Sequence, residues 1–331
     1  MDITSRRLRT SVSYFISAWF CISTFMSCQS SSSVDTKHIA IIDAIEDATM
    51  SEARRGYIDG LASKSFSEEE GNIKITARNA QGDIPTLMQS LQYFKSRQPD
   101  IIVANSTLSM ISSVRSIDDI PICMMVGPEP WMSEISSGPD DLPANLFGVY
   151  ENLDYVDTSF HIITSLMPDC RRVGVIYNQA ETQSLNALSR LKQIAAENNV
   201  EIINAPVTNS SETQLIVNSL INRRIDAFFA MPDNIIFSSF EVIFKACESN
   251  NIPIFTSEAG LVSRGAVAAY GADFYQWGFQ AGAISGQWLS EERTDDLPPL
   301  ELVKVRKKVY NPEAFDRYGF EPDTTFSTIK L

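Results

Sequence analysis

The sequence has 331 residues, 44% hydrophobic and 21% charged, and this ordinary globular composition and length suit two domains. Its formal net charge is −14 at pH 7, so it lacks the basic surface with which proteins bind nucleic acid. We therefore expect a two-domain globular protein with no nucleic-acid partner.

The first 28 residues have the pattern of an export signal. Three arginines between Arg6 and Arg9 precede a mostly apolar core, Tyr14 to Met26. This core is too short and too often interrupted by polar residues for a membrane-spanning helix. Cys28 at the cleavage point, followed by a polar tether over 29–37, resembles a bacterial lipoprotein signal in which the thiol is acylated. Plain secretion without the lipid is the alternative.

Short apolar runs alternate with helix candidates along the rest of the chain. The runs predict strands, and the helical periodicities between them predict helices. The expected strands are 38–45, 72–78, 100–105, 121–126, 171–177, 201–206, 225–231 and 252–256, and the expected helices are 50–63, 85–97, 183–197, 212–222 and 235–249. Apolar runs of this length, separated by helices, are typical of parallel sheets covered on both faces.

The two halves of the chain also repeat one pattern. "PDIIVA" (99–104) is followed by "DDIPI" (118–122), and "IDAFFA" (225–230) is followed by "NNIPI" (250–254). The sequence therefore predicts an α/β fold of two doubly wound, Rossmann-like lobes of similar plan.

The residues that directly follow the predicted strands are candidate ligand contacts. Right-handed crossovers bring the carboxyl ends of the strands to one edge, and ligands of such folds bind there. Hydroxyls and amides at helix N-termini suit a carboxylate, whereas acids and an indole suit an ammonium or an aromatic group. The candidates are Asp47, Ser106, Thr107, Glu129, Trp131, Asn178, Ser184, Asp233, Asn234 and Glu258.

Most of these candidates have a structural alternative. The alternatives are helix capping for Ser106, Ser184 and Asn234, solvent exposure for Glu129, charge balance at a helix N-terminus for Asp47 and Glu258, and packing for Trp131. For Asp233 the alternative is an ordinary surface turn at Pro232-Asp233-Asn234, but the apolar stretch "FFAMPDNIIF" (228–237) around it favours a functional role, because a carboxylate there needs a partner. We expect Asp233 to point into the cleft and to meet a cation.

The residues that catalysis or metal binding would need are sparse. His38 and His161 have no acid or cysteine at a suitable spacing, and Cys123, Cys170 and Cys247 are odd in number with no short Cys-x-x-Cys spacing. We expect these cysteines to be buried free thiols. Gly-rich nucleotide-binding motifs are absent. The sequence thus predicts a binding protein with no cofactor and no metal, and the alternative is a hydrolase that uses Asp233 or Glu258.

Several longer stretches carry a resemblance to a known family. They are "RRGYIDGL" (54–61), "NAQGD" (79–83), "MPDCRRVGVIYNQAETQS" (167–184), "DAFFAMPDN" (226–234) and "IPIFTSEAGLVSRGAVAAYGADFYQWG" (252–278). From about Ile39 to about Tyr310 the chain resembles the periplasmic or lipoprotein solute-binding components of ABC importers. The resemblance is to the branch that includes tryptophan- and tyrosine-binding members.

The resemblance implies a type I periplasmic binding protein fold, in which two lobes joined by three crossings close on a ligand. It implies a first lobe of 38–149 plus 273–301 and a second lobe of 150–272 plus 302–331. It also implies a monomer, anchored by lipid outside the cytoplasm, that passes an amino acid to an ABC permease. A membrane sensor as partner is the alternative.

Ligand roles follow from the resemblance position by position. Thr107, Ser184 and the amide of Asn178 would hold the carboxylate of an amino acid, and Asp233 with Asn234 would hold its ammonium. Several positions differ from the relatives, which commonly have Thr at Pro232, Asn at Gln183, a Thr-Asp-Pro loop at 128–130 and Pro at Leu108. We expect Pro232 to make the ligand of this chain differ. The candidate contacts also include Gln183, which lies in the expected ligand shell, and Asp273, which lies where the chain is expected to return to the first lobe.

Overall fold

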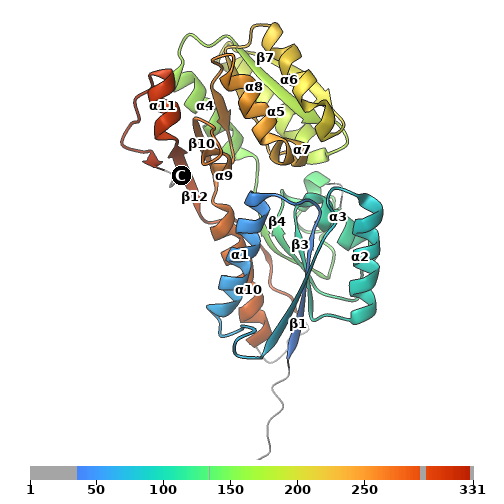
Figure 1. The fold of residues 1–331 in the computed structure, drawn as a ribbon. Coiled ribbons are helices and arrows are strands. Elements are labelled where there is room, and N and C mark those ends of the chain that lie inside the picture. The colour runs from blue at the N-terminus through green and yellow to red at the C-terminus, as the bar shows by residue number, and fades with distance from the viewer. Residues whose placement is uncertain (1–35, 134, 291–295, 329–331) are drawn as a thin grey trace, which may run out of the picture. The chain divides into compact units, whose positions relative to one another are not determined.

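The computed structural model describes residues 36–133, 135–290 and 296–328. It confirms the predicted α/β fold, with two sheets of mostly parallel strands and helices on both faces of each (Figure 1). The predicted signal and Cys28 lie outside the described residues. Within the described part, Cys123, Cys170 and Cys247 are buried and free, as predicted.

The first sheet has the strand order β11-β5-β4-β3-β1-β2. Its strands are β1 (Lys37–Asp43), β2 (Ile73–Asn79), β3 (Ile101–Asn105), β4 (Ile122–Val126), β5 (Leu146–Tyr150) and β11 (Leu300–Leu302). The helices packed on it are α1 (Ala48–Ala62), α2 (Ile84–Arg97), α3 (Thr107–Ser116) and α10 (Phe274–Ser290). We call these elements the first lobe.

The second sheet has the order β13-β12-β10-β9-β8-β6-β7. Its strands are β6 (Arg172–Asn178), β7 (Glu201–Val207), β8 (Ala227–Ala230), β9 (Ile254–Thr256), β10 (Ala268–Ala272), β12 (Arg306–Tyr310) and β13 (Ser327–Thr328). The helices grouped with it are α4 (Asp154–Leu166), α5 (Thr182–Glu197), α6 (Thr213–Asn222), α7 (Asn234–Ser238), α8 (Phe240–Glu248), α9 (Ala259–Val262) and α11 (Pro312–Tyr318). We call these elements the second lobe.

The alternation of side chains along β1 explains why helices cover both faces of the first sheet. Ile39 and Ile41 pack in the apolar cluster that includes α1 and α10. Ala40 and Ile42 pack in a separate cluster with α2 and α3. Since successive strand residues point to opposite faces, an all-apolar strand needs a cover on each side.

The chain passes between the lobes at three places within the described residues. It leaves the first sheet after β5 and enters α4. It returns from β10 into α10, which packs beside α1 (Figure 1). It leaves the first sheet again after β11, and β12 then pairs antiparallel with β10. The expected boundary between the lobes at 301/302 thus falls within strand β11, and the passage to the second sheet follows at 303–305.

One predicted helix differs from the structure. The periodicity of 235–249 predicted a single helix, but α7 ends at Ser238 and α8 begins at Phe240. Ser239 between them has φ −114° and ψ 12°, outside the helical region. Apolar periodicity does not register a single residue that leaves the helical conformation, so the break was not visible in the sequence.

The contact between α1 and α10 depends on glycines. A Cβ added at Gly278 would lie 1.8 Å from the carbonyl oxygen of Ala53, and one at Gly282 would lie 2.0 Å from that of Tyr57. Gly56 and Gly60 of α1 face α10 equally closely. The two helix backbones therefore approach to a distance that no side chain allows, which binds the returning α10 to the first lobe.

We predict that Gly278→Ala destabilises the protein by about 1–3 kcal/mol, because the added methyl group forces the two helices apart. Urea denaturation would measure this as a lower unfolding midpoint. Gly138→Ala is the matched control, since a Cβ there meets nothing within 4 Å. Equal midpoints for the two variants would contradict the close contact.

Candidate functional site

A cavity lies where residues that follow the strands of both sheets come together. Its polar lining from the first lobe is Ser106, Thr107 and Glu151, and from the second lobe Gln183, Asn234 and Glu258. Its apolar lining includes Met50, Tyr155, Pro232, Phe237, Phe274 and Trp277. The carboxyl ends of both sheets thus contribute to one site.

The N-terminus of α3 presents hydrogen-bond donors to one side of this cavity. Ser106 precedes the helix with φ 104°, a strained value for a residue other than glycine, and its N–H donates to the carbonyl of Val126 at 3.2 Å. Its hydroxyl is buried and has no hydrogen-bond partner within the described chain. No side chain caps α3. Free helix N–H groups beside the hydroxyls of Ser106 and Thr107 suit a carboxylate.

Glu258 is the acid of the cavity that has no partner among the residues that the structure describes. Its side chain is 3% exposed and takes part in no hydrogen bond or ion pair among the described residues. Burial raises its pKa well above the usual range, and the negative charges of Glu151 and Asp47 raise it further. A carboxyl group in this setting favours a cation that supplies both charge and hydrogen-bond donors.

The two neighbouring acids are already neutralised. Arg306 donates through Nε to Oε2 of Glu151 at 3.0 Å and through its terminal NH2 group to Oε1. Arg264 donates to Oδ2 of Asp47 at 2.8 Å. Asp47 also accepts from the N–H of Thr49 and so caps α1. These ion pairs leave Glu258 as the carboxyl group with unused acceptors on this side of the cavity.

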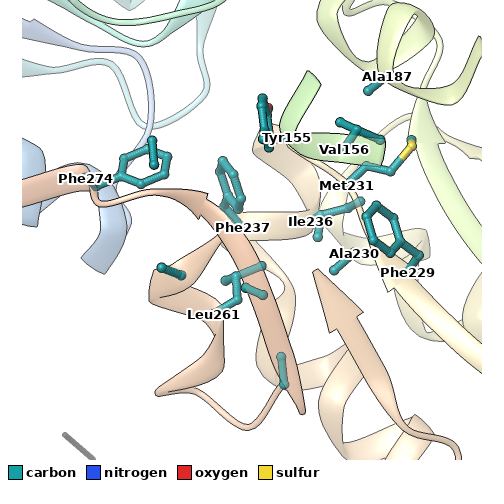
Figure 2. Packing of buried hydrophobic residues seen from close by; sticks show 14 of the residues in the cluster. Tyr155, Val156, Ala187, Phe229, Ala230, Met231, Ile236, Phe237, Leu261 and Phe274 are labelled. Carbon is teal, nitrogen blue, oxygen red and sulfur yellow. The ribbon is translucent and has the colours of Figure 1, made fainter. Parts of the chain in front are cut away.

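Aromatic side chains form the apolar wall. Figure 2 shows Tyr155, Phe237 and Phe274, which come from α4, α7 and α10. The rings of Phe237 and Phe274 meet edge to face, with centroids 6.4 Å apart. The indole N–H of Trp277 donates to the carbonyl of Val149 at 3.2 Å, which fixes that ring. A wall of this kind suits a flat apolar group.

Two amides line the remaining side, and both donate to Glu181. Nε2 of Gln183 and Nδ2 of Asn234 each lie 3.1 Å from its Oε2, and Nδ2 of Asn178 lies 2.9 Å from its Oε1. Burial raises the pKa of Glu181 to about 7, and the charge of Asp233 contributes to this rise.

Asp233 has a different place from the one predicted. It is fully buried and does not line the cavity. Its Oδ1 accepts from the N–H groups of Ile235 and Ile236, and so caps α7, while its Oδ2 accepts from the N–H of Asn178 at 2.8 Å and the hydroxyl of Ser184 at 2.6 Å. Donors of the chain itself thus satisfy the carboxylate, and in this conformation it does not face the cleft.

Ser184 and Asn178 therefore lie behind the cavity lining. The hydroxyl of Ser184 is committed to Asp233, and Asn178 binds both Asp233 and Glu181. Asp273 also lies outside the cavity, where it pairs with Lys307.

Glu129 and Trp131 lie beyond the cavity lining as well. The ring of Trp131 packs edge-on against Tyr150 at 5.6 Å and lines a separate surface pocket with Met132 and Asn186. Burial raises the pKa of Glu129, the charge of Asp154 raises it further, and a hydrogen bond with Trp131 opposes the rise.

The predicted residues that line the cavity are Ser106, Thr107, Gln183, Asn234 and Glu258. The sequence reading missed Glu151, Tyr155, Phe237, Phe274 and Trp277, as well as Glu181 beside the lining. Glu181 lies within the stretch 178–184 that follows the predicted strand 171–177, but it is not among the individual candidates that we drew from that stretch. The aromatic residues follow chain crossings or lie within helices and carry no such signal.

We predict that Asp233→Ala lowers the free energy of unfolding by about 2–4 kcal/mol, because it removes a helix cap and leaves two further buried donors without an acceptor. Urea denaturation would measure the loss. Asp83→Ala, at the exposed cap of α2, should cause a smaller loss. An Asp233→Ala variant as stable as the parent would refute the structural role.

Comparisons with known proteins agree with this architecture. Residues 38–324 match the family model of ABC transporter substrate binding protein. A tyrosine-binding protein of Clostridioides difficile is 32% identical over 266 residues, which are 80% of this chain and 76% of that protein. Among the described residues, no helix is long and apolar enough to cross a membrane.

Three solved structures show the same fold. A conserved domain protein of Vibrio cholerae has a TM-score of 0.81 at 23% identity, over 89% of this chain and 99% of that one. A Streptococcus pneumonia ABC domain in complex with L-Trp has a TM-score of 0.80 at 20% identity, over 88% and 97%. The ligand-free, open structure of a Clostridium difficile substrate-binding protein with adhesive properties has a TM-score of 0.66 at 27% identity, over 89% and 99%. The family match and the 32% identical relative show that this chain belongs to the ABC transporter substrate-binding proteins.

Proposed function

We propose that this protein is the extracytoplasmic binding component of an ABC importer and captures an amino acid, aromatic in its side chain, between its two lobes. The observation that carries the proposal is Glu258, a buried acid that faces the cavity and has no partner within the described part of the chain. The lipid anchor at Cys28, the monomeric state and the permease that receives the ligand belong to the same proposal.

The lining matches the three groups of such a ligand. The ammonium binds Glu258, which then has a charged partner. The carboxylate binds at the N-terminus of α3, with the hydroxyls of Ser106 and Thr107 as donors. The aromatic side chain packs against Phe237, Phe274 and Trp277. Glu258 thus replaces Asp233 as the proposed ammonium partner.

The activity of a relative supports the same ligand class. The 32% identical protein of Clostridioides difficile is a tyrosine-binding protein, and an aromatic amino acid satisfies each side of the cavity described above. Pro232 in the lining has no hydrogen-bond donor, so it adds to the apolar surface rather than to the polar one.

Capture requires the lobes to move. The empty cavity has a volume of about 50 Å³, room for a few water molecules and too little for an amino acid. Contacts that join the lobes in this conformation include the ion pair of Arg264 with Asp47, the hydrogen bond from Nδ2 of Asn186 to the carbonyl of Met132 at 3.1 Å, and the ring contact of Phe237 with Phe274. A ligand that enters an open form and adds contacts to both lobes shifts the population toward the closed form.

We predict that L-tyrosine or L-tryptophan raises the melting temperature of the purified protein, since a ligand that binds only the folded state stabilises it. Glu258→Gln should weaken this binding about 10- to 100-fold, because a charge-assisted hydrogen bond contributes about 1.5–3 kcal/mol. Titration calorimetry would measure the affinity. Glu201→Gln, an exposed change at the start of β7, is the control.

The same variant should stabilise the empty protein. A carboxyl group whose pKa is raised on folding makes the folded state less stable as pH rises above its unfolded value of 4.5. Above this pH, ligand-free Glu258→Gln should therefore melt at a higher temperature than the parent. An unchanged amino acid affinity in Glu258→Gln would show that Glu258 does not bind the ligand. If no amino acid raised the melting temperature of the parent protein, the proposed ligand class would be wrong.

We predict that breaking the ion pair between Asp47 and Arg264 weakens amino acid binding about 5-fold, because a coupling of about 1 kcal/mol is lost from the closed form alone. Asp47→Asn retains the cap of α1 and loses the charge, whereas Arg264→Gln loses the other partner. The double variant should bind no more weakly than the weaker single variant. Strictly additive losses would show that the two residues act separately.

A further inference from the structure

We propose that Glu181 is a positioning residue, which holds the side-chain amides of Gln183 and Asn234 so that their carbonyl oxygens are offered to the ligand. This inference deepens the proposed function and rests on it, because the offered acceptors need a ligand in the cavity. It concerns a residue behind the lining rather than a direct contact.

The geometry around Glu181 fixes which atom of each amide faces the cavity. Its Oε2 accepts from Nε2 of Gln183 and from Nδ2 of Asn234, both at 3.1 Å, and from the backbone N–H of Asn234 at 3.4 Å. Both amides line the cavity. Since their NH2 groups are turned toward Glu181, the oxygen of each amide is turned away from it.

The oxygen of Gln183 shows the consequence. Its Oε1 is buried and receives no hydrogen bond from any described residue. A buried acceptor without a donor costs about 1–3 kcal/mol, so a ligand that supplies a donor at this point recovers that free energy. An ammonium or a hydroxyl group provides such a donor, whereas an apolar ligand group does not.

Burial and one neighbouring charge together raise the pKa of Glu181 to about 7. Asp233, which precedes α7, is the charged group that raises its pKa beside the effect of burial. On the elements packed around it, Arg190 of α5 pairs with Asp157 of α4. Glu212, in the short helix η2 (Ser210–Glu212), is hydrogen-bonded to Thr208. Arg172 of β6 pairs with Glu201 at the opposite end of that strand.

The sign of the pH effect follows from the hydrogen bonds. Ionised Glu181 only accepts, so both amides must donate to it and keep their oxygens for the ligand. Protonated Glu181 carries an O–H that needs an acceptor, which a rotated amide oxygen supplies, and that oxygen is then lost to the ligand. Amino acid affinity should therefore rise with pH through about 7.

Titration calorimetry with L-tyrosine and L-tryptophan at pH 6 and pH 8 tests this effect. Ionisation of Glu181 rises from roughly one tenth to nine tenths over this range, so wild-type affinity should rise up to about 10-fold. In Glu181→Gln this step should be absent, while any contribution from Glu258 remains. Glu197→Gln, an exposed change on the same helix, should keep the wild-type profile. A step of equal size in Glu181→Gln would overturn the proposal.

A second measurement uses the wild-type protein without ligand, so it does not depend on a ligand or on the folding of a variant. In ligand-free wild type, the side-chain amide NMR signals of Gln183 and Asn234 should shift together with one inflection near pH 7. Signals that stay constant from pH 5 to pH 9 would overturn the positioning role. If these signals titrate but neither amino acid binds at any pH, the positioning role stands and the proposed ligand class fails.

Discussion

The carboxylate of Asp233 is the interaction on which the second-lobe side of the site depends. It joins the end of β6, the first turn of α5 and the start of α7 through four hydrogen bonds, all from donors of the chain. These segments carry Gln183 and Asn234, so the cavity lining is placed by an acid that does not itself line it. A buried carboxylate with four donors is stable without a cation, because hydrogen bonds to the charged form replace its hydration.

The acids around the cavity divide according to what satisfies them. Asp47 and Glu151 have arginine partners, and Asp233 has donors from the backbone and a hydroxyl. Glu181 has amide donors, and Glu258 has none among the described residues. Glu258 is therefore the acid of this group whose negative charge still lacks a compensating partner among the described residues. A cluster of acidic residues becomes selective in this way, since only one of them still needs a cation.

The sequence predicts the fold well, and the site in part. Apolar strand-length runs such as 100–105 specify parallel strands, and the rule that ligands bind after such strands leads to Ser106, Thr107 and Glu258. This rule cannot distinguish an acid whose hydrogen bonds come from the chain itself from an acid that needs a ligand. The donors to Asp233 include Asn178 and Ser184, which are distant in sequence and reach it only through the order of strands in the second sheet. The apolar flanks of Asp233 correctly indicated a buried acid that needs partners, but the partners are internal.

Under the proposed function, an unpaired acid in a closed cavity would also affect the motion of the lobes. With no ligand, closure removes Glu258 from water, and its neighbours Glu151 and Asp47 add repulsion, so the empty closed form is disfavoured or must take up a proton. A bound ammonium reverses this effect, because it neutralises the same carboxylate that opposed closure. The proposed ligand would thereby have a higher affinity for the closed form than for the open one, which is the condition for a population shift. The feature that makes the empty cavity unfavourable is thus the one that couples ligand binding to closure.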